Sequence, residues 1–277
     1  MLEMPEAVTI AQQMQSTLTG KTFQHFSRGV LMHKFLWLSK TAEEYAAILT
    51  GLKITGASSY GRSIFLHAGE ERLLWFGELG GRILYHPQGK PLPAKYHLRW
   101  DFTDNSVMTF TLQMWGFVQL LEMSELSEQP YAKGGIPPLS EAFTAEQFNQ
   151  LLEEYPDKTK KGVKGFLVTS QHVNGIGNSY LQDILFKAKI HPARKIPTLS
   201  TDDRQRLYTA IQNTLTQAIK LGGREEERDL FDRPGGYQRL MSSQSVGQPC
   251  PDCSTPIQKI SYLGGACYLC PHCQVQP

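Results

Sequence analysis

The sequence predicts a multidomain α+β protein, in which an N-terminal helix and an antiparallel β-sandwich or barrel are followed by a helical domain and a metal-binding β-hairpin. Short alternating apolar stretches fill the region from Thr22 to Leu121. Helical periodicity takes over after residue 140, and four cysteines near the end have the spacing C-x2-C-x16-C-x2-C. With 277 residues, of which 40% are apolar, the chain is long enough for two domains and a small appendage.

The first element is a predicted amphipathic helix over residues 4–19. Pro5 suits a first helical turn, apolar residues recur at helical spacing, and Gly20 suits a C-terminal cap. Seven strands then follow from alternating apolar residues between turn signals: 54–58, 63–68, 72–76, 82–86, 97–102, 107–112 and 117–121. These strands predict the sandwich or barrel.

A segment rich in proline and glycine, residues 128–140, predicts the linker between the domains. Beyond it, Thr144 suits a helix N-cap, and helical patterns cover residues 163–171, 180–188 and 202–221. The second domain is therefore predicted to be a helical bundle.

The C-terminal cysteines predict a zinc ribbon with one structural Zn²⁺, because two tight turns can present four thiolates to one tetrahedral ion. Alternating apolar residues and Gly264-Gly265 between the pairs favour two short antiparallel strands. Cys267 offers an alternative second pair with Cys270, and His272 is an alternative ligand. The predicted ligands are Cys250, Cys253, Cys270 and Cys273.

Composition argues against secretion and against a membrane span. The cysteine count is odd, all five cluster at one end, and the N-terminus does not resemble a signal peptide, so disulfides are not predicted. No apolar run of about 20 residues occurs. The expectation is a soluble, cytoplasmic protein, with its basic excess in the C-terminal half.

One motif points to nucleic acid. Gly175-Ile176-Gly177-Asn178 lies between two predicted helices, where main-chain N–H groups and an amide side chain can grip a phosphate oxygen. By itself such a turn is more often a structural cap. Here it belongs to a longer run from Val163-Lys164 through Gln171 to Asn178, followed by Ile190-His191-Pro192 and the cysteine pairs.

Together with Met1-Leu2-Glu3-Met4-Pro5-Glu6, these motifs resemble the formamidopyrimidine-DNA glycosylase and endonuclease VIII family over the whole chain. The resemblance implies a β-sandwich domain (1–127), a linker (128–140), a helix-two-turn-helix domain (141–236) and a zinc finger (237–277). It also implies a monomer that repairs damaged or abasic double-stranded DNA after swinging the base out of the stack.

The resemblance further implies a Schiff base between C1′ of the sugar and the N-terminal amine of a proline, assisted by an adjacent glutamate. This chain carries Leu2 at the proline position, Glu3 at the catalytic glutamate and Glu6 at a supporting one. Methionine removal before leucine is inefficient, which would leave the amine on Met1. A primary amine can still form an imine. Acidic residues in a first helical turn also have a purely structural explanation, because they complement the helix dipole.

The expected DNA contacts depart from the family pattern in a similar way. Arg62, which is grouped with Leu2, Glu3 and Glu6 as a predicted catalytic residue, stands for a phosphate-binding lysine. Glu78 stands for a void-filling side chain and Gln113 for an intercalating arginine, while Gly265 replaces a zinc-finger arginine. The residues predicted to contact DNA are Lys164, Asn178, Arg224, Arg228 and Trp115.

Three hypotheses follow. The first is a DNA glycosylase and abasic-site lyase that uses an atypical amine with Glu3 as acid and base. The second is an impaired paralogue that binds lesion or abasic DNA without cleaving it. The third is a scaffold that has left DNA and binds protein.

Overall fold

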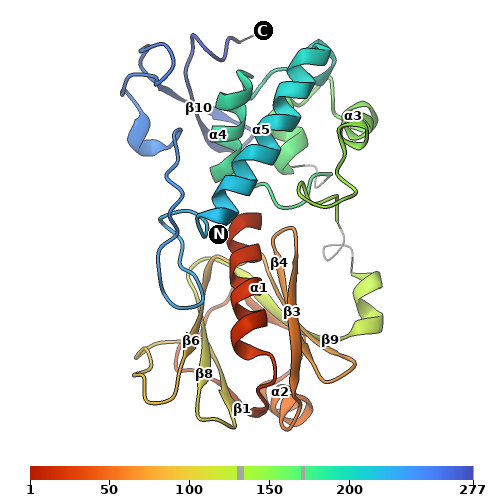
Figure 1. Ribbon diagram of the computed structural model, residues 1–277, viewed down its shortest axis with the longest axis vertical. Helices are drawn as coiled ribbons and strands as arrows, with labels where there is room; N and C mark the ends of the chain where they lie inside the picture. The colour runs from red at the N-terminus through yellow and green to blue at the C-terminus, as the bar shows by residue number, and fades with distance from the viewer. Residues whose placement is uncertain (130–133, 170–171, 277) are drawn as a thin grey trace. The chain divides into compact units, whose positions relative to one another are not determined.

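The computed structural model describes residues 1–129, 134–169 and 172–276 and divides into two compact units (Figure 1). The first unit comprises Met1–Lys133 together with Leu221–Gly236, and the second comprises Gly134–Lys220 together with Tyr237–Pro277. Part of the predicted linker, residues 130–133, and Gln171 of the motif lie outside the described residues.

The first unit is a β-sandwich with helix α1 (Met4–Leu18) packed against β3 and β4. One sheet has the order β1 (Phe23–Arg28), β7 (Leu98–Phe102), β8 (Val107–Leu112), β6 (Gly81–His86). The other has the order β2 (Leu36–Leu38), β9 (Gly116–Glu122), β5 (Arg72–Gly77), β4 (Ser63–Ala68), β3 (Ile54–Tyr60). The predicted sandwich is confirmed.

The hydrophobic core of the first unit anchors α1 and the residues just before it. Ile10 and Met14 of α1 are buried in the same cluster as Phe76 of β5 and Trp100 of β7. Leu2, just before the helix, joins this cluster. Burial of these side chains supplies the main driving force for folding and fixes the N-terminus of the chain against the sandwich.

Two strands and one α-helix of the first unit were missed from the sequence: β1, β2 and α2 (Ala42–Leu49). Helix α2 carried a readable signal, because Thr41 and Glu44 form a capping box before the buried Tyr45 and Leu49. Strand β2 also pairs parallel to β9, whereas the other named strand pairs are antiparallel in the residues described.

The segment Leu221–Gly236 differs from the predicted boundary, which assigned it to the helical domain. Leu230 is fully buried in the core of the first unit, and its carbonyl accepts a hydrogen bond from Tyr85 N of β6 at 2.8 Å. Apolar burial and this hydrogen bond hold the segment on the sandwich, although it follows helix α5 (Thr201–Lys220) in the chain.

The second unit contains the predicted helices and the cysteine hairpin. Its elements are α3 (Ala145–Glu154), a π-helical turn η2 (Gly165–Thr169), α4 (Asn178–Ala188), η3 (Ile196–Thr198), α5 (Thr201–Lys220), η4 (Ser243–Ser245), β10 (Gln258–Tyr262) and β11 (Gly265–Leu269). A further 3₁₀ turn, η1 (Met123–Glu128), ends the sandwich. The hairpin packs on α4 through Phe186, Ile257 and Cys270. Among the described residues, no helix combines the length and apolar character needed to cross a membrane.

Candidate functional site

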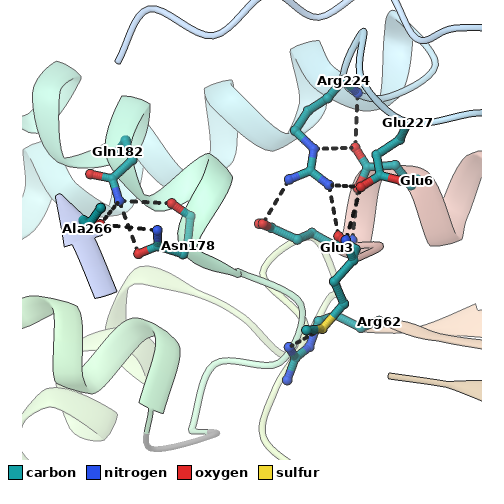
Figure 2. A network of polar contacts seen from close by, with 9 residues as sticks. Glu3, Glu6, Arg62, Asn178, Gln182, Arg224, Glu227 and Ala266 are labelled. Atoms are coloured by element: carbon teal, nitrogen blue, oxygen red, sulfur yellow. Dashed lines mark hydrogen bonds and ion pairs between the residues drawn. The ribbon is translucent and has the colours of Figure 1, made fainter. Parts of the chain in front are cut away.

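In the first unit, Arg224 lies within a cluster of glutamates at the N-terminus of α1 (Figure 2). Its Nη1 is 3.1 Å from Oε1 of Glu3, and these side chains are only 4% and 5% exposed. Its Nε lies 3.4 Å from Oε1 of Glu6, and its Nη2 donates to Oε1 of Glu227 at 2.9 Å. A buried guanidinium surrounded in this way compensates carboxylates that would otherwise be costly to bury.

Local backbone geometry builds this cluster. Glu6 caps the first turn of α1 by accepting the Glu3 N–H at 2.9 Å, and it also accepts the Arg224 N–H at 3.0 Å. Gly223 has φ +90°, and a Cβ there would lie 2.9 Å from Cγ of Glu6. Glycine is therefore required next to Arg224, because the backbone must turn in the left-handed region while touching Glu6.

Arg224 was predicted to contact DNA, and the structure places it in this buried cluster, which leaves the prediction untested. A side chain this deeply buried among glutamates is unavailable to a phosphate in this arrangement. Glu227 was not predicted as a site residue. Its spacing of three residues from Arg224 was the only local signal, because the remaining partners come from the opposite end of the chain.

The terminal amine belongs to Met1 and forms an ion pair with Oε1 of Glu227 at 3.1 Å. The Met1 carbonyl accepts a hydrogen bond from Nη2 of Arg224 at 2.9 Å. Leu2, the predicted position of the reactive amine, instead has an amide that donates to the Leu79 carbonyl at 2.7 Å. Its side chain is 2% exposed, so Leu2 acts as a core anchor beside the site.

Arg62 and Glu78, two departures from the family pattern, are partners. Arg62 Nη2 lies 3.2 Å from Oε1 of Glu78, and Arg62 Nη1 is 3.9 Å from the Met1 sulfur. The cation predicted near the sugar-phosphate is thus partly neutralised by the residue at the predicted void-filling position. Both side chains remain partly exposed, so this pair is weak and can exchange for a phosphate.

The aromatic residue predicted to stack on DNA lies at a surface edge. Trp115, which is 39% exposed, directly precedes β9, and Met114 is exposed beside it in the chain. Exposed Trp37 lies in β2, the strand that pairs with β9. Arg228, the other predicted DNA contact of this unit, is half-buried and bridges to Pro234 through its backbone.

In the second unit, Lys164 and Asn178 both contact the cysteine hairpin (Figure 2 shows Asn178). Lys164 is only 3% exposed, and its Nζ donates to the carbonyls of Tyr262 and Gly265 at 2.8 and 3.3 Å. Lys164 was predicted to contact DNA, and that contact stays a prediction for a side chain that the structure places against the hairpin turn. A Cβ on Gly265 would meet the Lys164 Nζ at 3.1 Å, so the lysine lies close to the space that a side chain there would use.

Asn178 is exposed at the start of α4, as a phosphate contact requires. Its Nδ2 donates to the Ala266 carbonyl at 3.2 Å, and Gln182, one turn later, donates to Asn178 Oδ1 at 3.1 Å. Gln182 also accepts the Tyr268 N–H at 3.0 Å. Sequence reasoning missed Gln182, which links α4 to β11 and orients Asn178.

The four predicted ligand cysteines converge, with their sulfurs all within 4.8 Å of one another. Separations of 3.9 Å for Cys250–Cys273, 3.4 Å for Cys253–Cys270 and 3.5 Å for Cys253–Cys273 bracket the ~3.8 Å of four thiolates around an ion at about 2.3 Å. The set fits a tetrahedral metal ion. Cys267 lies apart, with its sulfur 3.4 Å from Nζ of Lys164, and the clustered group does not include His272.

The surroundings of these thiols shift their pKa values in opposite directions. Hydrogen bonds from Thr255 lower the pKa of Cys253 to about 5, whereas burial, followed by the neighbouring cysteines, raises the pKa of Cys273 to about 12. Several thiolates this close repel one another unless a metal ion compensates them. Burial also raises the pKa of Cys267, against the opposing effect of the Lys164 ammonium.

Two family models and the curated relatives that resemble this chain all describe formamidopyrimidine-DNA glycosylases. Residues 1–113 match the family model described as Formamidopyrimidine-DNA glycosylase N-terminal domain, and residues 135–228 match the Formamidopyrimidine-DNA glycosylase H2TH domain. A formamidopyrimidine-DNA glycosylase of Bacillus cereus is 28% identical over 279 residues, covering 99% of both chains. One from Lactobacillus helveticus is 29% identical over 286 residues, with the same coverage.

Solved structures agree. The wild-type Lactococcus lactis Fpg (MutM), in complex with DNA containing N7-benzyl-Fapy-dG, superposes with a TM-score of 0.87 and is 25% identical, covering 99% of this chain and 100% of that one. The Lactococcus lactis Fpg bound to DNA with an abasic site has the same fold, with a TM-score of 0.87 at 24% identity.

Proposed function

This chain belongs to the formamidopyrimidine-DNA glycosylase family, and from that membership we propose that it is a DNA-repair protein that binds damaged or abasic duplex DNA as a glycosylase and abasic-site lyase. The observation that supports this most is the grouping of the terminal amine, Glu3 and Glu6 at the start of α1. Amine and carboxylates at one place are what imine formation and proton transfer require.

In this proposal the N-terminal amine forms a Schiff base with C1′ of the sugar. Glu3 handles protons at the sugar, and Glu6, which caps the helix and holds the Arg224 backbone, supports it. Arg62 contacts a phosphate by exchanging its exposed partner Glu78. Leu2 sets the position of the terminus through its buried side chain and amide.

DNA binding is proposed to use the exposed Asn178 at the start of α4 for a phosphate, Arg228 for the backbone and Trp115 for stacking on bases. Lys164 contributes by holding the hairpin turn. The four clustered cysteines are proposed to bind one structural Zn²⁺, which stabilises the hairpin and takes no part in the reaction. We also propose a cytoplasmic monomer.

A second candidate is the impaired paralogue that binds such DNA without cutting it. Two observations favour it: Leu2 carries a buried amide in place of a terminal proline amine, and Glu3 is paired with a buried guanidinium. The scaffold hypothesis has no comparable support, because Asn178 and Trp115 both remain exposed.

One experiment tests the main proposal against the alternative. The full chain is mixed with a duplex that carries a natural abasic site, sodium borohydride is added, and covalent complexes are separated by denaturing electrophoresis. Binding is measured in parallel on a duplex with a stable tetrahydrofuran analogue. Trapping supports the enzyme, and binding without trapping supports the paralogue. Absence of binding at low salt would overturn both.

A further inference from the structure

Met1 and the glutamates Glu3 and Glu6 of the first unit differ in how accessible they are to a substrate. Met1 keeps a side chain that is 25% exposed, and its amine faces the partly exposed Glu227. Glu3 and Glu6 are both buried against Arg224. Base excision needs a proton donor, whereas imine formation needs a nucleophilic amine. The difference in exposure between Met1 and the two glutamates therefore bears on the two reactions separately.

Removal of a base from an intact nucleoside breaks the C1′–N bond, and either the leaving base or the sugar ring oxygen must receive a proton. A guanidinium offers hydrogen-bond donors only, so a carboxyl oxygen bonded to it is held as an acceptor. Arg224 donates to Glu3 through Nη1 and to Glu6 through its backbone N–H, and its Nε forms an ion pair with Glu6 at 3.4 Å. Both glutamates are thereby engaged by Arg224 as acceptors, whereas base excision requires a proton donor at the nucleoside.

Reaction with an existing abasic site needs no proton on a leaving base or on the ring oxygen, because the base is already gone and the ring-opened sugar presents an aldehyde. The Met1 ammonium passes one proton to the Glu227 carboxylate, and the neutral amine forms a bond from nitrogen to the aldehyde carbon. The carbonyl oxygen then leaves as water after taking up two protons, one returned from Glu227 and the other given up by the attacking nitrogen. The products are a protonated imine and one water, so atoms and charge balance without an oxidant or a metal.

Three groups of Met1 contact neighbouring residues of the site. Its amine pairs with Glu227, its carbonyl accepts from Arg224, and its sulfur lies beside Arg62. Loss of Met1 would remove all three contacts and place the amine on Leu2, whose nitrogen bonds to Leu79 and whose side chain is in the core.

We propose that the first unit forms imines with pre-existing abasic sites through the retained Met1 amine, and that Arg224 withholds Glu3 and Glu6 from base excision. This rests on the lyase half of the proposed function and replaces its glycosylase half, so that the substrate class is the aldehyde of an abasic sugar.

The test uses the full chain with a C-terminal tag, after intact-mass measurement of Met1. Borohydride trapping is compared on duplexes with one abasic site or one 8-oxoguanine, formamidopyrimidine-guanine or dihydrouracil. The expected result is trapping on the abasic duplex, with the adduct mapped by peptide mass to Met1. Trapping on each damaged base is expected to be lower by about 100-fold or more, the least that general acid catalysis contributes.

A matched variant carries Gly-Ser before Met1, which moves the amine away from Glu227 without changing any residue of the fold. It should still bind the tetrahydrofuran duplex and lose trapping by about tenfold or more. Comparable trapping on a damaged base, or an adduct on a lysine or on Leu2, overturns the inference while leaving the lyase function intact. Binding with no trapping on the abasic duplex also overturns it, whereas failure to bind any duplex overturns the proposed function itself.

Discussion

The ammonium of Lys164 donates a hydrogen bond to the carbonyl oxygen of Tyr262 across 2.8 Å, at the end of the first hairpin strand. The same group reaches the Gly265 carbonyl beyond the turn, so one buried cation ties both ends of the turn to the segment before η2. The hairpin is therefore held by a side chain from the helical part of the second unit as well as by its own cysteines.

We expect Lys164→Met to loosen this turn, because two partly buried carbonyls lose their donor at a cost of about 1–3 kcal/mol. Hydrogen exchange measured by mass spectrometry on peptides covering Lys259–Tyr268 should become faster by about 5- to 150-fold where exchange follows local opening. The matched control is Lys259→Met, an exposed lysine on β10. Equal exchange in the two variants would show that Lys164 does not hold the turn.

Removal of Arg224 should destabilise the first unit strongly. Arg224→Met leaves Glu3, Glu6 and Glu227 without their buried cation, a loss of about 3–5 kcal/mol in unfolding free energy. All four tryptophans lie in the sandwich, so their fluorescence during urea unfolding reports this unit alone. Arg233→Met is the control, because Arg233 is well exposed in its pair with Asp229 and should cost about 1 kcal/mol at most. Similar losses in both variants would contradict the cluster's role.

Glu227 should control the reactivity of the Met1 amine more than DNA affinity. For Glu227→Gln we expect the borohydride trapping rate on abasic duplex to fall by about 10- to 100-fold, because the amine loses the partner that places it. Glu227→Asp should restore part of the rate, and the exposed Glu225→Gln should leave it unchanged. A fall in affinity for the tetrahydrofuran duplex that accounts for the whole effect would assign Glu227 to binding.

The sequence predicted the elements that depend on local pattern. The start of α1 follows from Pro5 and the spacing of Ile10 and Met14, and the hairpin follows from the cysteine spacing. Helix α2 was missed because its amphipathic face is only eight residues long and lies among strands. Short segments of this kind are decided by tertiary packing more than by periodicity.

The candidate site was only partly predictable because its partners are distant in the chain. Glu3 and Arg224 are 221 residues apart, and no local rule brings them together. The Arg62–Glu78 pair shows the same difficulty. The sequence identified which residues carry chemistry, whereas burial and pairing, which decide whether Arg224 and Lys164 face solvent, emerged only from the fold.

The metal site separates two cysteines only three residues apart. Cys270→Ala should abolish stoichiometric zinc binding and unfold the hairpin, because metal binding supplies much of its folding free energy. Cys267→Ala should keep one bound zinc, since Cys267 points to Lys164 and lies outside the group of four. The measurement is the amount of zinc released per chain on denaturation, determined with a colorimetric chelator for both variants. Retention by Cys270→Ala with loss by Cys267→Ala would reverse the ligand assignment.

Asn178 tests the proposed DNA contact of the second unit. Asn178→Ala should weaken binding to undamaged, damaged and abasic-analogue duplexes alike, because a phosphate contact carries no information about the base. A hydrogen bond to a charged group is worth about 1.5–3 kcal/mol, so affinity should fall by about tenfold or more. The control is Asn149→Ala on α3, whose side chain is bonded within its own helix to the Ala145 carbonyl and which should bind DNA as the parent does.

Fluorescence anisotropy at fixed salt measures the affinity for all three duplexes. A loss confined to one of them would mean that Asn178 reads the lesion, and an unchanged affinity would remove α4 from the interface.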